Sequence, residues 1–242
     1  MYPWGKYVKL SNDIADYSAD DIFANFREVT GGNLKDNILY RGSSPADNIY
    51  NRASTCDLLL EKAGISLVLD LADDEEKFEK HMLSDDFDSP YLMSLYDSEN
   101  VILVGLSARY RNEDYAEELV EALNQMTEYE GPYYVHCTLG FDRTGFVCIL
   151  LESIAGFSYD EIEKDYMLSY ADFYNVTKES DPAKYEAIKE AKFEDTVFWL
   201  YDIADESEIS GVDLEECAKD YLMDGGMSEE EYQKLKETLV VE

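Results

Sequence analysis

The most informative segment of the sequence is Tyr133-Tyr134-Val135-His136-Cys137-Thr138-Leu139-Gly140-Phe141-Asp142-Arg143-Thr144-Gly145. Its first four residues are typical of a buried strand, and the almost wholly apolar stretch at 145–155 is typical of a buried helix. A loop with a central glycine therefore lies between a strand and a helix, which is where an open α/β sheet binds its ligands. The segment predicts an α/β fold with this loop as its functional centre.

The loop has the features of an anion-binding site. Its backbone amides can turn inward as a nest, and the N-terminus of the following helix points its partial positive charge at the same place. Gly140 permits the tight bend that such a loop needs. We expect a bound phosphate to be surrounded by Thr138, Leu139, Gly140, Phe141, Asp142 and Arg143.

The side chains of the loop suggest nucleophilic chemistry on phosphorus. A thiol attacks well only as the thiolate, which a helix N-terminus and a nearby arginine favour. Cys137 is the candidate nucleophile, and Arg143 can grip two phosphate oxygens with its planar fork. Thr144 can donate its hydroxyl to the departing thiolate, and His136 is expected to hydrogen-bond backbone and hold the shape of the loop.

The string His136-Cys137-x5-Arg143-Thr144 resembles the signature of the protein-tyrosine phosphatase superfamily. The longer string is most similar to the atypical bacterial tyrosine and lipid phosphatases, which typically read His-Cys-x-x-Gly-Lys-Asp-Arg-Thr-Gly. Other stretches resemble motifs of that family in the expected order: Asn25-Phe26-Arg27-Glu28-Val29, Leu39-Tyr40-Arg41-Gly42, residues 64–71 and Asp165-Tyr166-Met167-Leu168-Ser169. The resemblance covers about residues 25–175. It implies a protein-tyrosine-phosphatase-like fold, with a central, mostly parallel sheet flanked by helices.

The resemblance also suggests a general acid. In that family the aspartate of the loop, here Asp142, protonates the leaving oxygen and later activates water. Asp142 can instead brace the loop while another carboxylate acts as the acid. The other candidates in the sequence are Asp70, Asp97 and the acids of Asp85-Asp86-Phe87-Asp88.

Phe141 departs from the pattern of the family, which has lysine at this position. The resemblance associates that lysine with recognition of the extra phosphates of phosphoinositides. Phenylalanine removes this charge and offers an aromatic face, so we expect a preference for phosphotyrosine or other aryl phosphates. Arg41 is a further candidate for steering the anion, although pairing with one of the many carboxylates is the more common role of such an arginine.

The remaining sequence predicts one domain over residues 1–242, with an N-terminal extension (1–24), a catalytic core (25–175) and a helical C-terminal section (176–242). The expected strands are 38–41, 65–71, 101–104 and 133–136. The expected helices are 52–63, 112–129, 145–155, 158–170, 182–204, 213–223 and 228–238. Residues 72–100 are acidic and predict an irregular segment with a turn at Ser89-Pro90.

Composition limits the partners of the protein. The 54 acidic residues outnumber the 20 basic ones, and the resulting formal charge of −34 repels nucleic acid and anionic membranes. No segment is long enough to insert into a membrane. The cysteines and histidines lack the spacing of a zinc site, and a thiolate mechanism needs neither metal nor organic cofactor.

The sequence therefore predicts a cysteine-dependent phosphatase of the protein-tyrosine or dual-specificity type. Its expected partner is a phosphorylated protein or a small aryl phosphate. The alternatives are a non-catalytic phosphate-binding module and an inositol phosphate or phosphoinositide phosphatase. The oligomeric state is left open. The expected location is cytoplasmic by default, with a secreted or surface protein as the alternative if a leader has been removed.

Overall fold

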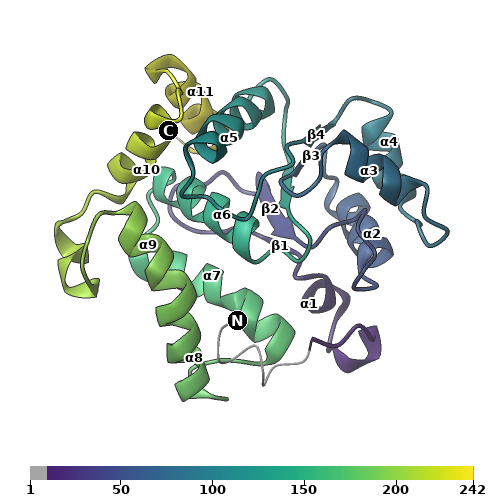
Figure 1. The fold of residues 1–242 in the computed structure, drawn as a ribbon, viewed down its shortest axis with the longest axis horizontal. Helices are drawn as coiled ribbons and strands as arrows, with labels where there is room; N and C mark the ends of the chain where they lie inside the picture. The colour runs from purple at the N-terminus through teal and green to yellow at the C-terminus, as the bar shows by residue number, and fades with distance from the viewer. Residues whose placement is uncertain (1–9, 242) are drawn as a thin grey trace.

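The computed structural model describes residues 10–241, except for the side chain of Glu113. Its centre is a sheet with the strand order β1-β2-β5-β3-β4 (Figure 1). The strands are β1 (Arg27–Glu28), β2 (Leu39–Gly42), β3 (Leu67–Asp70), β4 (Val101–Leu103) and β5 (Tyr133–His136). β1 is antiparallel to β2 and the other neighbours are parallel. The predicted α/β fold with a mostly parallel sheet is thus confirmed.

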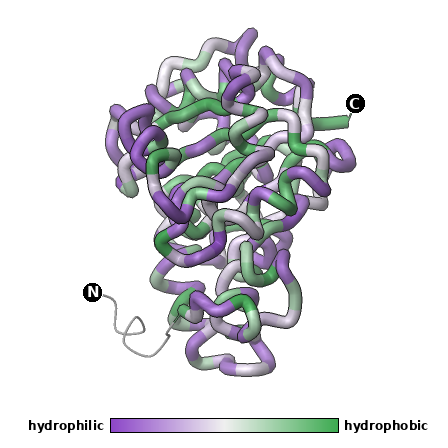
Figure 2. The backbone as a smooth tube through the Cα atoms, turned by 90° about the vertical axis from the view of Figure 1, so that its right-hand side faces the viewer, coloured by the Kyte–Doolittle hydropathy of each residue, from purple (hydrophilic) through white to green (hydrophobic). Residues whose placement is uncertain are grey.

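Helices cover both faces of the sheet. They are α2 (Ala53–Ala63), α3 (Glu75–Met82), α4 (Pro90–Tyr96), α5 (Glu113–Met126) and α6 (Asp142–Ile154). Within β3, Leu67 and Leu69 belong to one apolar layer together with α5 and α6. Val68 belongs to a second layer together with α2, α3 and α4. The strands are therefore buried on both faces, which explains their continuous apolar sequences. In Figure 2 the hydrophobic segments cross the interior.

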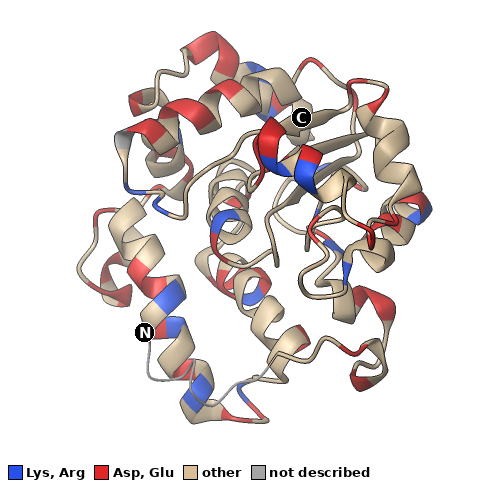
Figure 3. Ribbon diagram, turned by 45° about the vertical axis from the view of Figure 1, so that its right-hand side comes forward, with Lys and Arg blue, Asp and Glu red and all other residues tan. Residues whose placement is uncertain are grey.

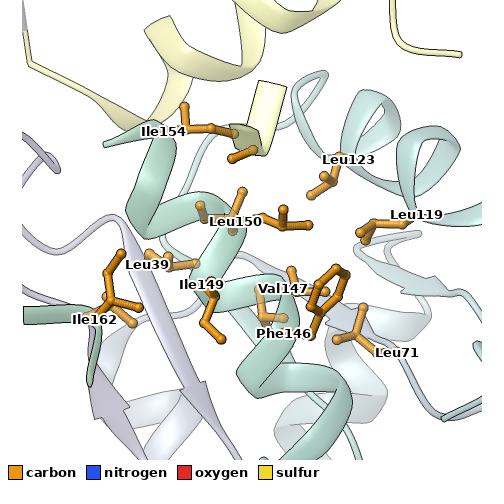
Figure 4. Close-up of a cluster of buried hydrophobic side chains, with 14 of the residues drawn as sticks. Leu39, Leu71, Leu119, Leu123, Phe146, Val147, Ile149, Leu150, Ile154 and Ile162 are labelled. Carbon is orange, nitrogen blue, oxygen red and sulfur yellow. The ribbon is translucent and has the colours of Figure 1, made fainter. Parts of the chain in front are cut away.

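The helix that follows the functional loop is the most buried one. Between Thr144 and Ile154 every residue of α6 is buried. Its apolar side chains extend in several directions, toward α5, the sheet and α7 (Figure 4). Because α6 is fixed on all sides, its N-terminus holds a fixed position at the edge of the sheet.

The remaining helices lie around this core. They are α1 (Asp20–Ala24), α7 (Tyr159–Tyr174), α8 (Pro182–Ile188), the π-helical segment η3 (Lys189–Glu194), α9 (Asp195–Leu200), α10 (Leu214–Asp224), α11 (Glu229–Leu239) and the short 3-10 segments η2 (Ile14–Asp16) and η4 (Glu206–Gly211). The helix starts predicted at Ser158 and Ser228 are confirmed, each as a complete capping box. α10 packs on α5 and α6, while η3 packs on α7. The division into extension, core and C-terminal section stays a prediction.

Three predictions about the positions of helices were wrong. Residues 72–100 are not irregular, because they contain α3 and α4. The Asp74 side chain accepts a hydrogen bond from Lys77 N at 2.9 Å and caps α3, and Pro90 begins α4 rather than forming a turn. The helix predicted at 182–204 is interrupted by η3 and ends at Leu200. In addition, α6 begins at Asp142, three residues before the predicted start.

The charge of the chain is spread over its surface. Acidic residues recur on many of the helices in Figure 3, and basic residues are fewer. Among residues 10–241, no helix is both long and apolar enough to cross a membrane.

Candidate active site

The functional loop occupies the edge of the sheet at which the parallel strands end. β5 lies between β2 and β3, so the loop after His136 is flanked by the segments that follow Gly42 and Asp70. Cys137, the first residue after β5, is 4% exposed. Gly140 has a φ of +76°, and a Cβ atom there would lie 2.5 Å from the Gly42 carbonyl oxygen. A residue with a side chain does not fit this turn without displacing its neighbours.

Three consecutive carbonyl groups of the loop accept hydrogen bonds from groups outside it. Ser44 N donates to Thr138 O at 3.2 Å, Asn25 Nδ2 donates to Leu139 O at 2.9 Å, and Arg41 Nη2 donates to Gly140 O at 3.0 Å. In a trans peptide the N–H points away from the C=O. The amides of residues 139–141 therefore face the other side, where they join the free N–H groups of the first turn of α6. The result is a cradle of donors for an anion.

The donors Asn25 and Arg41 are themselves held by a buried ion network. Asp165 of α7 pairs with Arg41 and with Arg27, whose Nε lies 2.8 Å from Asp165 Oδ1. Arg27 also donates from Nη1 to Asn25 Oδ1 at 2.7 Å. Burial alone would raise the pKa of Asp165, but the charges of Arg27 and Arg41 hold it well below its usual value. Asp165 therefore remains a carboxylate that orients both arginines.

His136 and Asp70 lie next to the loop, in register on neighbouring strands. His136 Nδ1 is 3.4 Å from the Cys137 carbonyl oxygen, and burial lowers the pKa of His136 to about 4, so the ring is neutral. Asp70 Oδ1 accepts hydrogen bonds from the amides of Ala72 and Asp73, and burial raises the pKa of Asp70 to about 6. Asp70 thus braces the turn after β3.

Arg143 and Thr144 occupy the first turn of α6. Arg143 is half-buried, and its Nη1 donates to the Leu106 carbonyl at 2.9 Å, which fixes the guanidinium beside the loop. Thr144 is fully buried, and its Oγ1 has no hydrogen-bond partner within the described part of the chain. The expected bond from Thr144 to the sulfur of Cys137 is not formed in this structure.

A pocket of about 430 Å³ opens beside the start of α6. Asp142 and Phe146 of α6 line it, together with Tyr110 and Tyr166. The Asp142 side chain is 57% exposed, and its Oδ1 lies 3.2 Å from the ammonium of Lys192. Asp142 is thus the one carboxylate of the loop, and it faces a space that is lined by aromatic rings.

Phe141 does not point freely into solvent. Its ring contacts three rings of α7, those of Tyr170, Phe173 and Tyr174, with centroids 4.9, 5.1 and 6.0 Å away. Phe141 therefore ties the loop to the C-terminal end of α7.

Several residues of the site were not identified from the sequence as functional. Asn25, Arg27 and Asp165 occur only within stretches that resemble family motifs, and Ser44 and Lys192 belong to no motif. The motif stretches at 25–29, 39–42 and 165–169 converge on the loop, so their order in the chain was the available clue. No group of metal-ligating side chains that could hold an ion occurs in the described residues.

A comparison with curated proteins gives no match. The family model described as "Tyrosine phosphatase family" matches residues 21–241, which includes the C-terminal helices as well as the loop. The chain therefore belongs to the tyrosine phosphatase family.

Proposed function

We propose that this phosphatase hydrolyses aryl phosphomonoesters, phosphotyrosine among them, through a thiophosphate on Cys137. The observation that supports this most is the outward orientation of the carbonyl groups of residues 138–140, which turns the amides of the loop toward an anion. Arg143 lies in the first turn of α6, directly after the loop, and the Leu106 carbonyl holds its guanidinium. Such a cradle suits the equatorial oxygens of a phosphoryl group in transfer.

In the first step the Cys137 thiolate attacks phosphorus in line with the leaving oxygen. The S–P bond forms while the P–O bond breaks, and the amides and Arg143 balance the charge on the equatorial oxygens. Asp142, as a carboxylic acid, donates its proton to the leaving oxygen. The products are a free phenol or alcohol, a phosphorylated Cys137 and an Asp142 carboxylate.

In the second step water releases the phosphate. The Asp142 carboxylate accepts a proton from water as the oxygen attacks phosphorus, and the S–P bond breaks to return the thiolate. Thr144 is adjacent to Arg143 in the first turn of α6, and its buried hydroxyl, which has no partner among the described residues, donates to the departing sulfur in this step. Inorganic phosphate leaves, and Asp142 is again protonated.

The surroundings of Asp142 favour an aryl leaving group. The rings of Tyr110, Phe146 and Tyr166 line the pocket beside it. The loop position that is lysine in the resembling phosphatases is Phe141, whose ring is packed on α7. Arg109, Arg111 and Lys192 also line the pocket, but Arg111 and Lys192 are paired with Asp195 and Asp142. The aromatic rings and the missing lysine at position 141 favour a phosphorylated aromatic ring over a polyphosphorylated inositol.

The test is hydrolysis of phenyl phosphate, whose leaving oxygen needs a proton, in the presence of a chelator, from acidic to neutral pH. We expect Cys137→Ser to abolish turnover and Asp142→Ala to lower it by about 10²-fold or more. Cys217→Ser, at a half-buried position on α10, is the matched control and should leave turnover unchanged.

Either of two results would contradict this proposal and favour another function. A wild-type protein that binds phosphate but turns over no substrate would be a phosphate-binding module. A protein that hydrolyses inositol lipids faster than phosphotyrosine peptides would be a phosphoinositide phosphatase.

A further inference from the structure

The C-terminal helices contribute a charged side chain to the site. Lys192 lies 50 residues beyond Asp142 in the chain, and its Nζ donates to Asp142 Oδ1 at 3.2 Å. The Lys192 side chain is only 21% exposed, although it is one of the more strongly hydrated side chains. It belongs to η3, the π-helical segment, a conformation that is rare and frequently occurs at functional sites.

The position of Lys192 is fixed by its neighbours in η3. The next residue, Phe193, is fully buried and contacts the ring of Tyr166, with centroids 5.5 Å apart. Lys189, at the start of η3, forms ion pairs with Glu163 at 3.3 Å and Glu206 at 2.9 Å. Both anchors hold η3 on α7, so Lys192 faces the start of α6 from a rigid support.

The opposite wall of the pocket is bound to the helical unit that α8, η3 and α9 form together. Tyr110 and Thr196 share a hydrogen bond of 2.9 Å between their hydroxyl groups, and Arg111 Nη2 lies 2.7 Å from Asp195 Oδ2. Thr196 in turn donates to the Lys192 carbonyl at 2.7 Å. These bonds join two segments across the pocket. One contains Leu106, whose carbonyl accepts from Arg143, and the other contains Lys192.

We propose that Lys192 is a positioning residue for the Asp142 carboxyl group. This inference rests on the proposed function, in which Asp142 is the general acid. A carboxyl group that is more than half exposed samples several rotamers, and proton donation requires it within hydrogen-bond reach of the leaving oxygen. The ammonium of Lys192 selects the rotamer that faces the pocket, and it keeps the regenerated carboxylate there for the attack of water.

The dependence of the rate on the leaving group distinguishes this role from a structural one. Phenyl phosphate and phosphotyrosine need a proton on the leaving oxygen, whereas nitrophenyl phosphates release a phenolate that is stable without one. We expect Lys192→Met to lower kcat about tenfold for the first class and by less than about twofold for the second. Lys192→Arg, which keeps a cation, should lose less than Lys192→Met. Lys184→Met is the matched control, since Lys184 pairs with Asp181 on the same helical unit outside the pocket, and it should change neither class.

A double-mutant cycle with Asp142→Ala completes the test. If Lys192 acts through Asp142, then Lys192→Met causes no further loss on phenyl phosphate once Asp142 is alanine. An equal loss in both backgrounds, or an equal loss for both substrate classes, would overturn the role of Lys192 while leaving the proposed function intact. A wild-type protein without hydrolytic activity would overturn the proposed function and this inference together. Thermal unfolding of each variant identifies losses that come from misfolding.

Discussion

Arg41 donates to the Gly140 carbonyl at 3.0 Å while the same guanidinium is paired with Asp165. One side chain therefore connects the loop after β5 to α7. We predict that Arg41→Lys lowers kcat by about 10²-fold, because a point charge cannot serve both partners and the loop carbonyl is released. The measurement is kcat on phenyl phosphate, with urea unfolding in parallel.

A comparison with Arg41→Met separates the contribution of Arg41 to stability from its contribution to the geometry of the loop. It leaves the Asp165 carboxylate, 13% exposed, with Arg27 alone, and breaking a buried pair costs about 3–5 kcal/mol in the free energy of unfolding. Arg41→Lys should lose clearly less stability than Arg41→Met. Equal activity of the lysine variant and the wild type would show that the bond to Gly140 does not support catalysis.

Gly140→Ala is predicted to damage the cradle directly. The left-handed φ of +76° and the 2.5 Å approach to Gly42 both oppose a Cβ atom. We expect a loss of about 1–3 kcal/mol in the free energy of unfolding and about 10²-fold or more in kcat/KM. Gly211→Ala is the control, because a Cβ there meets no atom within 4 Å, and it should remain within about 0.5 kcal/mol of wild type. A fully active Gly140→Ala enzyme would contradict the assigned loop geometry.

The sequence predicted the elements whose signals are local. The strand before Cys137 and the buried helix after it are contiguous apolar runs, and the helix starts at Ser158 and Ser228 depend on residues three positions apart. The start of α3 was missed because Phe78 is its one fully buried residue, so no apolar periodicity marks this helix. Its cap at Asp74 was hidden among other acidic residues.

The parts of the site that escaped prediction depend on tertiary contacts. Asp165 and Arg41 are 124 residues apart, and nothing in either motif specifies that they meet beneath the loop. The sequence predicts one continuous helix around Lys192. The direction of the Lys192 side chain is set by the π-helical segment and by the packing of Phe193 on Tyr166. A single sequence shows which residues have useful chemistry, but the distances between them follow from how the helices pack on the sheet.

Phe141 offers a prediction about specificity. Phe141→Lys restores the cation of the resembling phosphatases beside the loop, and it should raise the ratio of phosphoinositide to phosphotyrosine turnover by about tenfold, as expected for one charge-assisted contact of about 1.5 kcal/mol. Phe141→Leu, which removes the ring contacts with Tyr170 and Tyr174 without adding charge, is the control. If both variants shift the ratio equally, the packing on α7 rather than the charge determines the preference.

Asp70 provides a prediction about pH. Burial raises its pKa from 3.8 to about 6, and the neighbouring Asp73 is raised to about 6 as well. A carboxyl whose pKa is raised by folding is protonated in both states below about pH 4, and it destabilises the native state increasingly as the pH rises through 6. Asn keeps an oxygen that can accept from the amides of Ala72 and Asp73 and cannot ionise. Asp70→Asn should therefore be more stable than wild type at pH 7.5, by about 3 kcal/mol, and equal to it near pH 4.

Urea unfolding at the two pH values measures this difference, and the comparison with wild type at each pH cancels the effect of the large net charge. Asp36→Asn, at an exposed turn position, is the matched control and should stay within about 0.5 kcal/mol of wild type at both pH values. A lower stability of Asp70→Asn at pH 7.5 would mean that the Asp70 carboxylate stabilises the fold through its two amide bonds by more than its burial costs. In that case Asp70 would be an ionised brace of the sheet edge beside Cys137 with a pKa below its ordinary value, and the site would weaken only as the pH falls through that lower pKa.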